Sequence, residues 1–243
     1  MWAKLQAWWQ SLWITKSAAS NDLNTNLKPP ESTNITWEIP SYHTARKLAA
    51  KLETLIDEKL MQTSASEFKA ACLSKDANFL VYLAGKALVD IGVREKTNNN
   101  DGELVELIQK IAGGVKGHPW CMYFVLVCVA YAESKTGKKS KIYNSGSCAS
   151  VRKNSAGLAI DYKNSKAGDI WIWRYPSTGN GHTGVFGGWL PKYKAATLKE
   201  GNTTLGKIGD KIVREGGGAY TTEREVITNT KASMYLPMAI RPF

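Results

Sequence analysis

Apolar residues recur at helical spacing from Tyr42 onward, and this pattern predicts a series of helices. One face of the first segment carries, with Lys and Glu residues between them, Leu48, Leu52, Leu55, Ile56 and Leu60. The sequence Ser64-Ala65-Ser66-Glu67 is typical of a helix N-terminus, so we expect a second helix to run from there to about Cys72.

Two more helices and one apolar segment follow. A helix is expected over 78–89, ending at Gly92, and a short one over 101–111. The segment 121–131 is apolar almost all round, which fits either a buried helix or a strand. Its length and the charged run 133–141 after it favour the buried helix.

After Lys166 the pattern changes to that of β-strands. Ala167-Gly168-Asp169 is a turn signal, and a β-rich segment follows it directly. The expected strands cover 170–173, 183–189 and 195–198, with weaker candidates over 207–213, 224–230 and 236–241. Helices first and strands second predict an α+β fold with an antiparallel sheet.

The amino terminus is rich in Trp, and residues 16–40 are polar and predict a linker. On a helix, one face of residues 1–14 would carry Trp2, Leu5, Trp9, Leu12 and Trp13. This face suits docking on the protein body or on a partner, and equally suits a membrane surface, because Trp prefers interfaces. A signal peptide is the third reading, although polar residues interrupt its apolar core. No stretch of about 18 apolar residues exists, so no transmembrane helix is predicted.

Composition is ordinary for a globular protein, but the charge is unevenly spread. The 243 residues are 43% hydrophobic and 22% charged, with a net charge of +11. Residues 1–80 hold nine basic and eight acidic residues, and residues 81–243 hold 23 basic and 13 acidic residues. The basic half would attract a polyanion such as the anionic bacterial cell wall or nucleic acid, or it serves solubility alone. The sequence has no basic-aromatic motif, so we expect no nucleic-acid partner.

The four cysteines do not form a recognisable disulfide or zinc pattern. The chain is long and poor in Cys, it has no Cys-x-x-Cys motif, and its three His residues are scattered. Cys72 and Cys128 lie in helical apolar patterns and are expected to be core thiols. Cys148 is expected in a loop or at a strand edge, with no assigned role.

Cys121 is the candidate nucleophile. It follows Pro119-Trp120 at the expected start of the buried helix, where unpaired N–H groups and the helix dipole favour a thiolate. Only the thiolate of a cysteine is nucleophilic, so this position suits the chemistry. The alternative is one more buried thiol.

His182 is the candidate base, and Glu200 the candidate orienting acid. His182 lies in a Gly-rich stretch, Gly179-Asn180-Gly181-His182-Thr183-Gly184, which leaves room for its ring at a strand start. It is preferred to His118, only three residues from Cys121, and to His43 in the first helix. A carboxylate on a neighbouring strand would fix the tautomer of the imidazole and stabilise its charged form.

These motifs together resemble the CHAP family of cysteine, histidine-dependent amidohydrolases/peptidases. The resemblance rests on Pro119-Trp120-Cys121, Lys166-Ala167-Gly168-Asp169, Gly181-His182-Thr183-Gly184-Val185 and Glu200-Gly201-Asn202-Thr203, in that order. Asn98-Asn99-Asn100-Asp101-Gly102 is also similar to one branch that includes phage-encoded members. The resemblance covers roughly residues 80–243.

The resemblance implies a papain-like α+β fold and cleavage of an amide bond in peptidoglycan. In this reading Cys121 is the nucleophile, His182 the general base, Glu200 the orienting acid, and Asn202 a fourth member of the set. We also expect Trp120 and Trp173 to contact the substrate. Some family members hold calcium, but residues 98–102 have few carboxylates, so we expect neither a metal nor a cofactor.

The expected organisation is a Trp-rich segment and linker over 1–40, a helical appendage over 41–80, and a CHAP domain over 81–243. The function it implies is that of an N-acetylmuramoyl-L-alanine amidase or an endopeptidase, phage-encoded or secreted to the cell wall. The rival hypothesis is a structural or wall-binding protein of a virion or secretion machine, in which the CHAP domain serves docking more than lysis.

Overall fold

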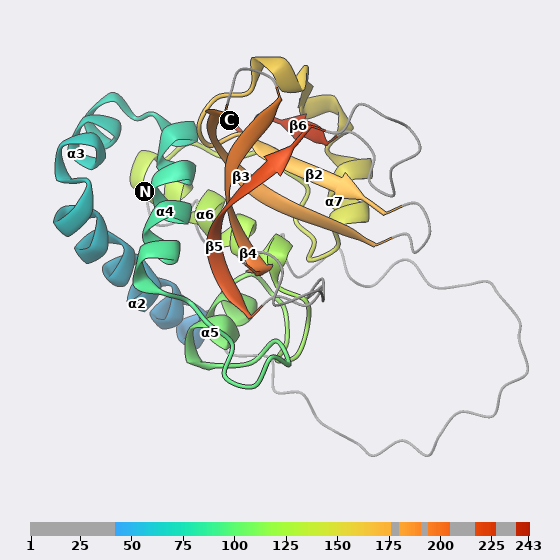
Figure 1. Cartoon of the computed structure of the whole chain (residues 1–243). Helices are drawn as coiled ribbons and strands as arrows, with labels where there is room; N and C mark the ends of the chain where they lie inside the picture. The colour runs from blue at the N-terminus through green and yellow to red at the C-terminus, as the bar shows by residue number, and fades with distance from the viewer. Residues whose placement is uncertain (1–41, 176–179, 191–193, 205–216, 227–236) are drawn as a thin grey trace, which may run out of the picture. The chain divides into compact units, whose positions relative to one another are not determined.

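The computed structural model describes residues 42–175, 180–190, 194–204, 217–226 and 237–243 (Figure 1). Residues 48–243 form one compact unit. The Trp-rich segment 1–14, the linker over 16–40 and the expected strand over 207–213 lie outside the described residues.

Within the described residues, helices come first and a sheet follows. The α-helices are α2 (Tyr42–Thr63), α3 (Ala65–Ser74), α4 (Ala77–Ile91), α5 (Glu103–Ile111), α6 (Cys121–Thr136) and α7 (Cys148–Asn154). The strands are β1 (Ala159–Ile160), β2 (Ile170–Arg174), β3 (Gly181–Leu190), β4 (Ala195–Thr203), β5 (Gly218–Glu225) and β6 (Met238–Ile240). They form one antiparallel sheet in the order β1-β6-β2-β3-β4-β5. The predicted α+β class is confirmed.

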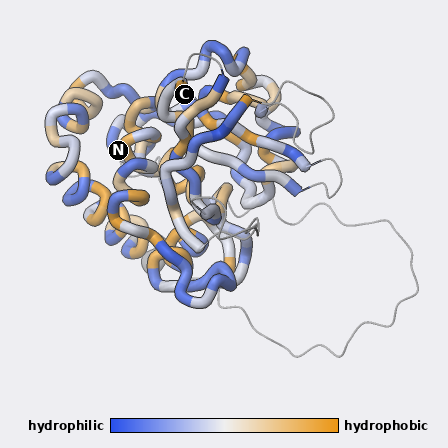
Figure 2. Tube along the Cα trace, in the orientation of Figure 1, coloured by the Kyte–Doolittle hydropathy of each residue, from blue (hydrophilic) through white to orange (hydrophobic). Residues whose placement is uncertain are grey.

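Local signals in the sequence set the ends of the central helices. The Asp76 side chain caps α4 by accepting the Phe79 N–H at 3.0 Å, and Gly92 ends the helix in a left-handed conformation, with φ 83°. The segment 121–131 is a helix, as predicted, and is part of α6, which Gly137 ends with φ 71°. In Figure 2 hydrophobic and hydrophilic stretches alternate along the helices.

The sheet differs from the sequence prediction at its margins. A strand was expected over 224–230, of which 227–230 lie outside the described residues, and β5 covers Gly218–Glu225. Pairing with β4 decides this, because Ala195 lies opposite Glu225 and Thr203 lies opposite Gly218. β1 and α7 were not predicted, since two and seven residues are too short to show a period.

Two hydrophobic clusters pack in the described unit. The larger contains most buried residues of α4, α5 and α6 together with Ile170, Ile172 and Val185 from the sheet. Leu52, Ile56 and Leu60 of α2 belong to the same cluster, so the second half of α2 shares this core. The smaller cluster contains three aromatic residues, Trp171, Trp173 and Phe186, together with Ala196, Leu198 and Ala239. Strand alternation explains the division, because successive residues of β2 face opposite sides.

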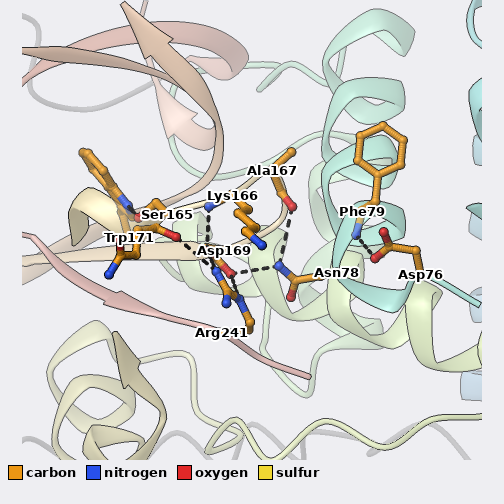
Figure 3. Close-up of polar contacts among 10 residues, drawn as sticks. Asp76, Asn78, Phe79, Ser165, Lys166, Ala167, Asp169, Trp171 and Arg241 are labelled. Atoms are coloured by element: carbon orange, nitrogen blue, oxygen red, sulfur yellow. Dashed lines mark hydrogen bonds and ion pairs between the residues drawn. The ribbon is translucent and has the colours of Figure 1, made fainter. Parts of the chain in front are cut away.

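Buried Asp169 anchors the start of β2 to the rest of the fold (Figure 3). Its carboxylate accepts the Asn78 Nδ2–H of α4 at 2.8 Å and the Lys166 N–H at 2.7 Å. Arg241, just after β6, donates to both oxygens of the same carboxylate, at 2.9 and 2.7 Å. Figure 3 shows Asn78 and Arg241 both pointing at this carboxylate. The strand that leads into the candidate site is therefore tied to α4 and to the carboxyl end of the chain.

Candidate functional site

Cys121 is the first residue of α6, at the position the sequence predicted. Its side chain is buried, and the preceding Trp120 is fully buried. The indole of Trp120 donates to Glu95 Oε1 at 2.8 Å and packs edge-on against Phe124. Burial and this hydrogen bond fix the start of α6, and with it the direction of the Cys121 side chain.

The surroundings of Cys121 favour its ionised form. The largest influence on its pKa is a hydrogen bond with Cys148, whose Sγ lies 3.7 Å from that of Cys121. Burial opposes ionisation, but a hydrogen bond with His182, the charge of that ring and the Met122 backbone N–H all favour it. The net result is a pKa well below the ordinary value of a thiol.

His182, the second residue of β3, lies between the thiol and a carboxylate. Its Nε2 is 3.1 Å from Glu200 Oε2, which leaves Nδ1 as the ring nitrogen that faces the Cys121 sulfur. Trp173 lies directly opposite on β2, and its ring stacks on the imidazole at a centroid distance of 6.3 Å. These contacts hold the ring in one orientation.

The imidazole is held in its charged form. Burial is the largest single influence on the pKa of His182 and lowers it. The negative charge of Glu200 and hydrogen bonds to Cys121 and Glu200 outweigh burial and raise the pKa to about 9. Near neutral pH the site therefore contains a thiolate and an imidazolium, which are the two parts of an activated cysteine nucleophile.

Glu200 is completely buried in β4 and lies between two cations. Arg224 of β5 donates from Nε to Oε1 at 2.9 Å and from Nη2 to Oε2 at 2.5 Å. Burial pushes the pKa of Glu200 upward, but His182 and Arg224 more than compensate and lower it to about 2. The carboxylate therefore stays ionised where it contacts the imidazole.

Two glycines let the parts of the site approach each other. A Cβ at Gly184 would lie 2.7 Å from Glu200 Cγ, and a Cβ at Gly201 would lie 2.6 Å from Phe124 Cβ and 2.7 Å from Trp120 Cζ3. Real Cβ atoms do not come so close, so these positions require glycine. Gly184 admits the Glu200 side chain beside β3, and Gly201 lets β4 lie against the first turn of α6.

The remaining predicted residues lie near this set in different ways. Asn202 has φ 54° and lies in an irregular stretch of β4, where the register with β5 shifts between Glu200 and Thr203. The strand alternation that would place Asn202 on the same side as Glu200 is therefore interrupted. Trp173 is only 3% exposed and Trp120 is 0% exposed. Both indoles pack inside the fold beside the site, and the expected contact with a substrate stays a prediction.

The sequence favoured His182 over His118 as the candidate base, and His118 lies outside the Cys121–His182–Glu200 set. Its Nδ1 is 3.2 Å from the hydroxyl of Tyr123, and the two rings stack.

Sequence reasoning missed two members of the site, Arg224 and Cys148. Arg224 lies in a weakly predicted strand, and nothing local distinguishes it from other arginines. Cys148 was assigned to a loop or strand edge, whereas it is the first residue of α7. The sequence Ser147-Cys148-Ala149-Ser150 did carry a capping signal, since Ser147 Oγ accepts the Ser150 N–H at 3.3 Å.

The described residues contain no group of three or more His, Cys, Asp or Glu side chains that could hold a metal ion. In the loop before α5, Asp101 accepts hydrogen bonds from the Lys96 backbone N–H and from Thr97. Glu95 accepts hydrogen bonds from the Trp120 indole N–H and from the Asn100 backbone N–H.

In the part of the chain that the structure covers, no helix is long and apolar enough to cross a membrane.

Comparisons of the chain with family models, with curated proteins and with solved structures found no match.

Proposed function

We propose that residues 81–243 form a CHAP-type, papain-like domain that hydrolyses an amide bond of peptidoglycan through a Cys121 thioester. The proposal rests chiefly on one observation, the line of contacts that runs from buried Cys121 through partly exposed His182 to buried Glu200. The depressed thiol pKa and the raised imidazole pKa are perturbations of the kind that cluster at functional sites. The order and spacing of the motifs support the choice of family and substrate.

In the proposed reaction the Cys121 thiolate attacks the carbonyl carbon of the amide and forms a C–S bond. The carbonyl oxygen takes the negative charge, and the Cys121 backbone N–H at the first turn of α6 would donate to it. The C–N bond then breaks as the His182 imidazolium gives its proton to the leaving amine. A thioester and a neutral imidazole remain.

Water completes the cycle. The neutral His182 takes a proton from the attacking water, the C–S bond breaks, and the carboxylic acid product leaves. The thiolate and the imidazolium are restored. Glu200 keeps its negative charge throughout, and it stabilises the imidazolium whenever His182 carries a proton.

The test is digestion of purified peptidoglycan by the full chain, with mass spectrometry of the released fragments. We expect new amino termini with the unaltered protein and with Cys128→Ala, in which a buried thiol of α6 is removed away from the site. Cys121→Ala should retain the fold and release nothing. Full lysis by Cys121→Ala, or no cleaved bond with walls of several peptide types, would reject the proposal. The fragment masses also distinguish an amidase from an endopeptidase.

A further inference from the structure

A second thiol lies in direct contact with the candidate nucleophile. Cys148, the first residue of α7, and Cys121, the first residue of α6, are both buried, and their sulfurs are 3.7 Å apart. The proposed reaction assigns no task to Cys148. Cys128 is a buried, free thiol on the same helix as Cys121, seven residues along from the paired sulfurs, which makes it a natural control.

The position of Cys148 is fixed on three sides. Ser147 caps α7, and Arg152 of that helix donates from Nη1 to the Ile172 carbonyl of β2 at 2.7 Å. A Cβ at Gly181 would lie 2.9 Å from Cys148 Cβ, so the residue before His182 packs directly on this cysteine. The starts of α6, α7 and β3 thus meet at the two sulfurs.

The surroundings decide which sulfur keeps its proton. Cys121 has the imidazolium of His182 and the Met122 N–H beside it, and its pKa is lowered. The hydrogen bond to Cys121 and burial both raise the pKa of Cys148 well above the ordinary value. The pair therefore ionises at Cys121, and the proton between the sulfurs belongs to Cys148.

We propose that the Cys148 thiol donates a hydrogen bond to the Cys121 thiolate, and so positions the nucleophilic sulfur and holds it ionised. The role of Cys121 as nucleophile rests on the proposed function. A buried anion without donors is costly, and each hydrogen bond it accepts reduces that cost. A thiol is a weak donor, so it stabilises the anion while leaving the sulfur free to attack. Cys148 keeps its proton throughout, and no bond to its sulfur forms or breaks.

The first test measures alkylation of Cys121 by iodoacetamide against pH, with the modified peptide identified by mass spectrometry and a phosphine present to keep the thiols reduced. Relative to the unaltered protein, Cys148→Ala should move the midpoint to higher pH. Below the midpoint it should slow alkylation by about threefold, because part of the loss of thiolate is offset by greater nucleophilicity. Cys148→Ser retains a donor and should restore much of the difference. Cys128→Ala should leave the midpoint unchanged.

A second measurement needs no variant of Cys148. With ¹³Cβ-labelled cysteine, the NMR shift of each Cβ reports the ionisation of its own thiol in the full chain. Cys148 should stay protonated over the range in which Cys121 is a thiolate, and in Cys121→Ala its titration should move to lower pH.

The proposal is overturned if Cys148→Ala has the same alkylation midpoint as the unaltered protein. If that variant does not fold, an unchanged Cys148 titration in Cys121→Ala overturns it instead. Neither measurement uses cell wall, so the two proposals fail separately. A shifted midpoint in a protein that cleaves no peptidoglycan would reject the proposed function alone, and normal cleavage with an unmoved midpoint would reject the role of Cys148 alone.

Discussion

Arg224 binds both oxygens of the Glu200 carboxylate, which is completely buried between the arginine and the His182 ring. Arg224 also donates from Nη2 to Thr203 Oγ1 at 3.3 Å, and its guanidinium lies 6.0 Å from the centre of the Trp173 ring. A bidentate arginine fixes the plane of a carboxylate as well as its charge. The orientation of His182 therefore depends on β5, which acts on the imidazole through Glu200.

Replacing Arg224 should weaken both stability and the site. In Arg224→Gln the buried carboxylate keeps only His182 as a cation, and we expect the free energy of unfolding to fall by about 2 kcal/mol. Arg174→Gln removes the same charge from an exposed side chain of β2 and should change it by less than about 0.5 kcal/mol. Urea unfolding at pH 7 measures both. Equal stability of the two variants would show that the Arg224–Glu200 contact contributes nothing.

Activity should depend on pH through the thiolate–imidazolium pair. Its acid limb should reflect protonation of Cys121, whose pKa is lowered, and its alkaline limb should reflect loss of the His182 proton at a pKa of about 9. The rate of peptidoglycan cleavage, measured at constant ionic strength, should therefore remain high at pH 7–8 and decline near pH 9. A rate that declines on the alkaline side near the ordinary His pKa of 6.5 would contradict this assignment.

Removing the charge of Glu200 should move the alkaline limb. Glu200→Gln has nearly the same shape but no negative charge, so the imidazolium loses the charge that raises its pKa. We expect the limb to move to lower pH and the cleavage rate at pH 8 to fall. Glu133→Gln is the matched control, because Glu133 is also buried but lies near the far end of α6, where it accepts the Ser140 N–H at 2.8 Å. An alkaline limb that stays in place in Glu200→Gln would separate Glu200 from the imidazole.

Stability should fall in acid through the same carboxylate. The pKa of Glu200 is about 2 in the folded protein against an ordinary value of 4.5, so its contribution is present above pH 4.5 and is lost as pH falls toward 2. His182, whose pKa is raised from 6.5 to about 9, adds no net slope between pH 6.5 and 9, because the folded protein holds one proton on His182 and the unfolded chain holds one on Cys121, whose ordinary pKa is 9.0. Urea unfolding should therefore show the acid slope and little change in stability from pH 6.5 to 9. Glu200→Gln should flatten the acid slope, and an unchanged slope would contradict the prediction.

Gly201 should not tolerate a methyl group. The added Cβ in Gly201→Ala would overlap Phe124 and Trp120 at the start of α6, and we expect a loss of about 1–3 kcal/mol in unfolding free energy. Gly188→Ala in β3 is the control, because its nearest contact would be Thr197 Oγ1 at 3.9 Å. Thermal and urea unfolding distinguish the two. If Gly201→Ala were as stable as Gly188→Ala, β4 and α6 could not pack as closely as described.

The sequence by itself determined the helices that precede α7, the central strands and three residues of the site. Asp76 and Gly92 mark the ends of α4, and the apolar run after Cys121 is too long for an ordinary strand and forms a helix. Both could be predicted because helix caps and the length of an apolar run are local properties of the chain. Cys121, His182 and Glu200 could be named because each sits in a distinctive local context. Only the tertiary structure decided how they meet. Arg224 contacts Glu200 from a neighbouring strand, Cys148 contacts Cys121 from the start of a short helix, and Asn202 lies where the register between β4 and β5 shifts. Side chains that meet only after the sheet and helices pack leave no period or motif in the sequence.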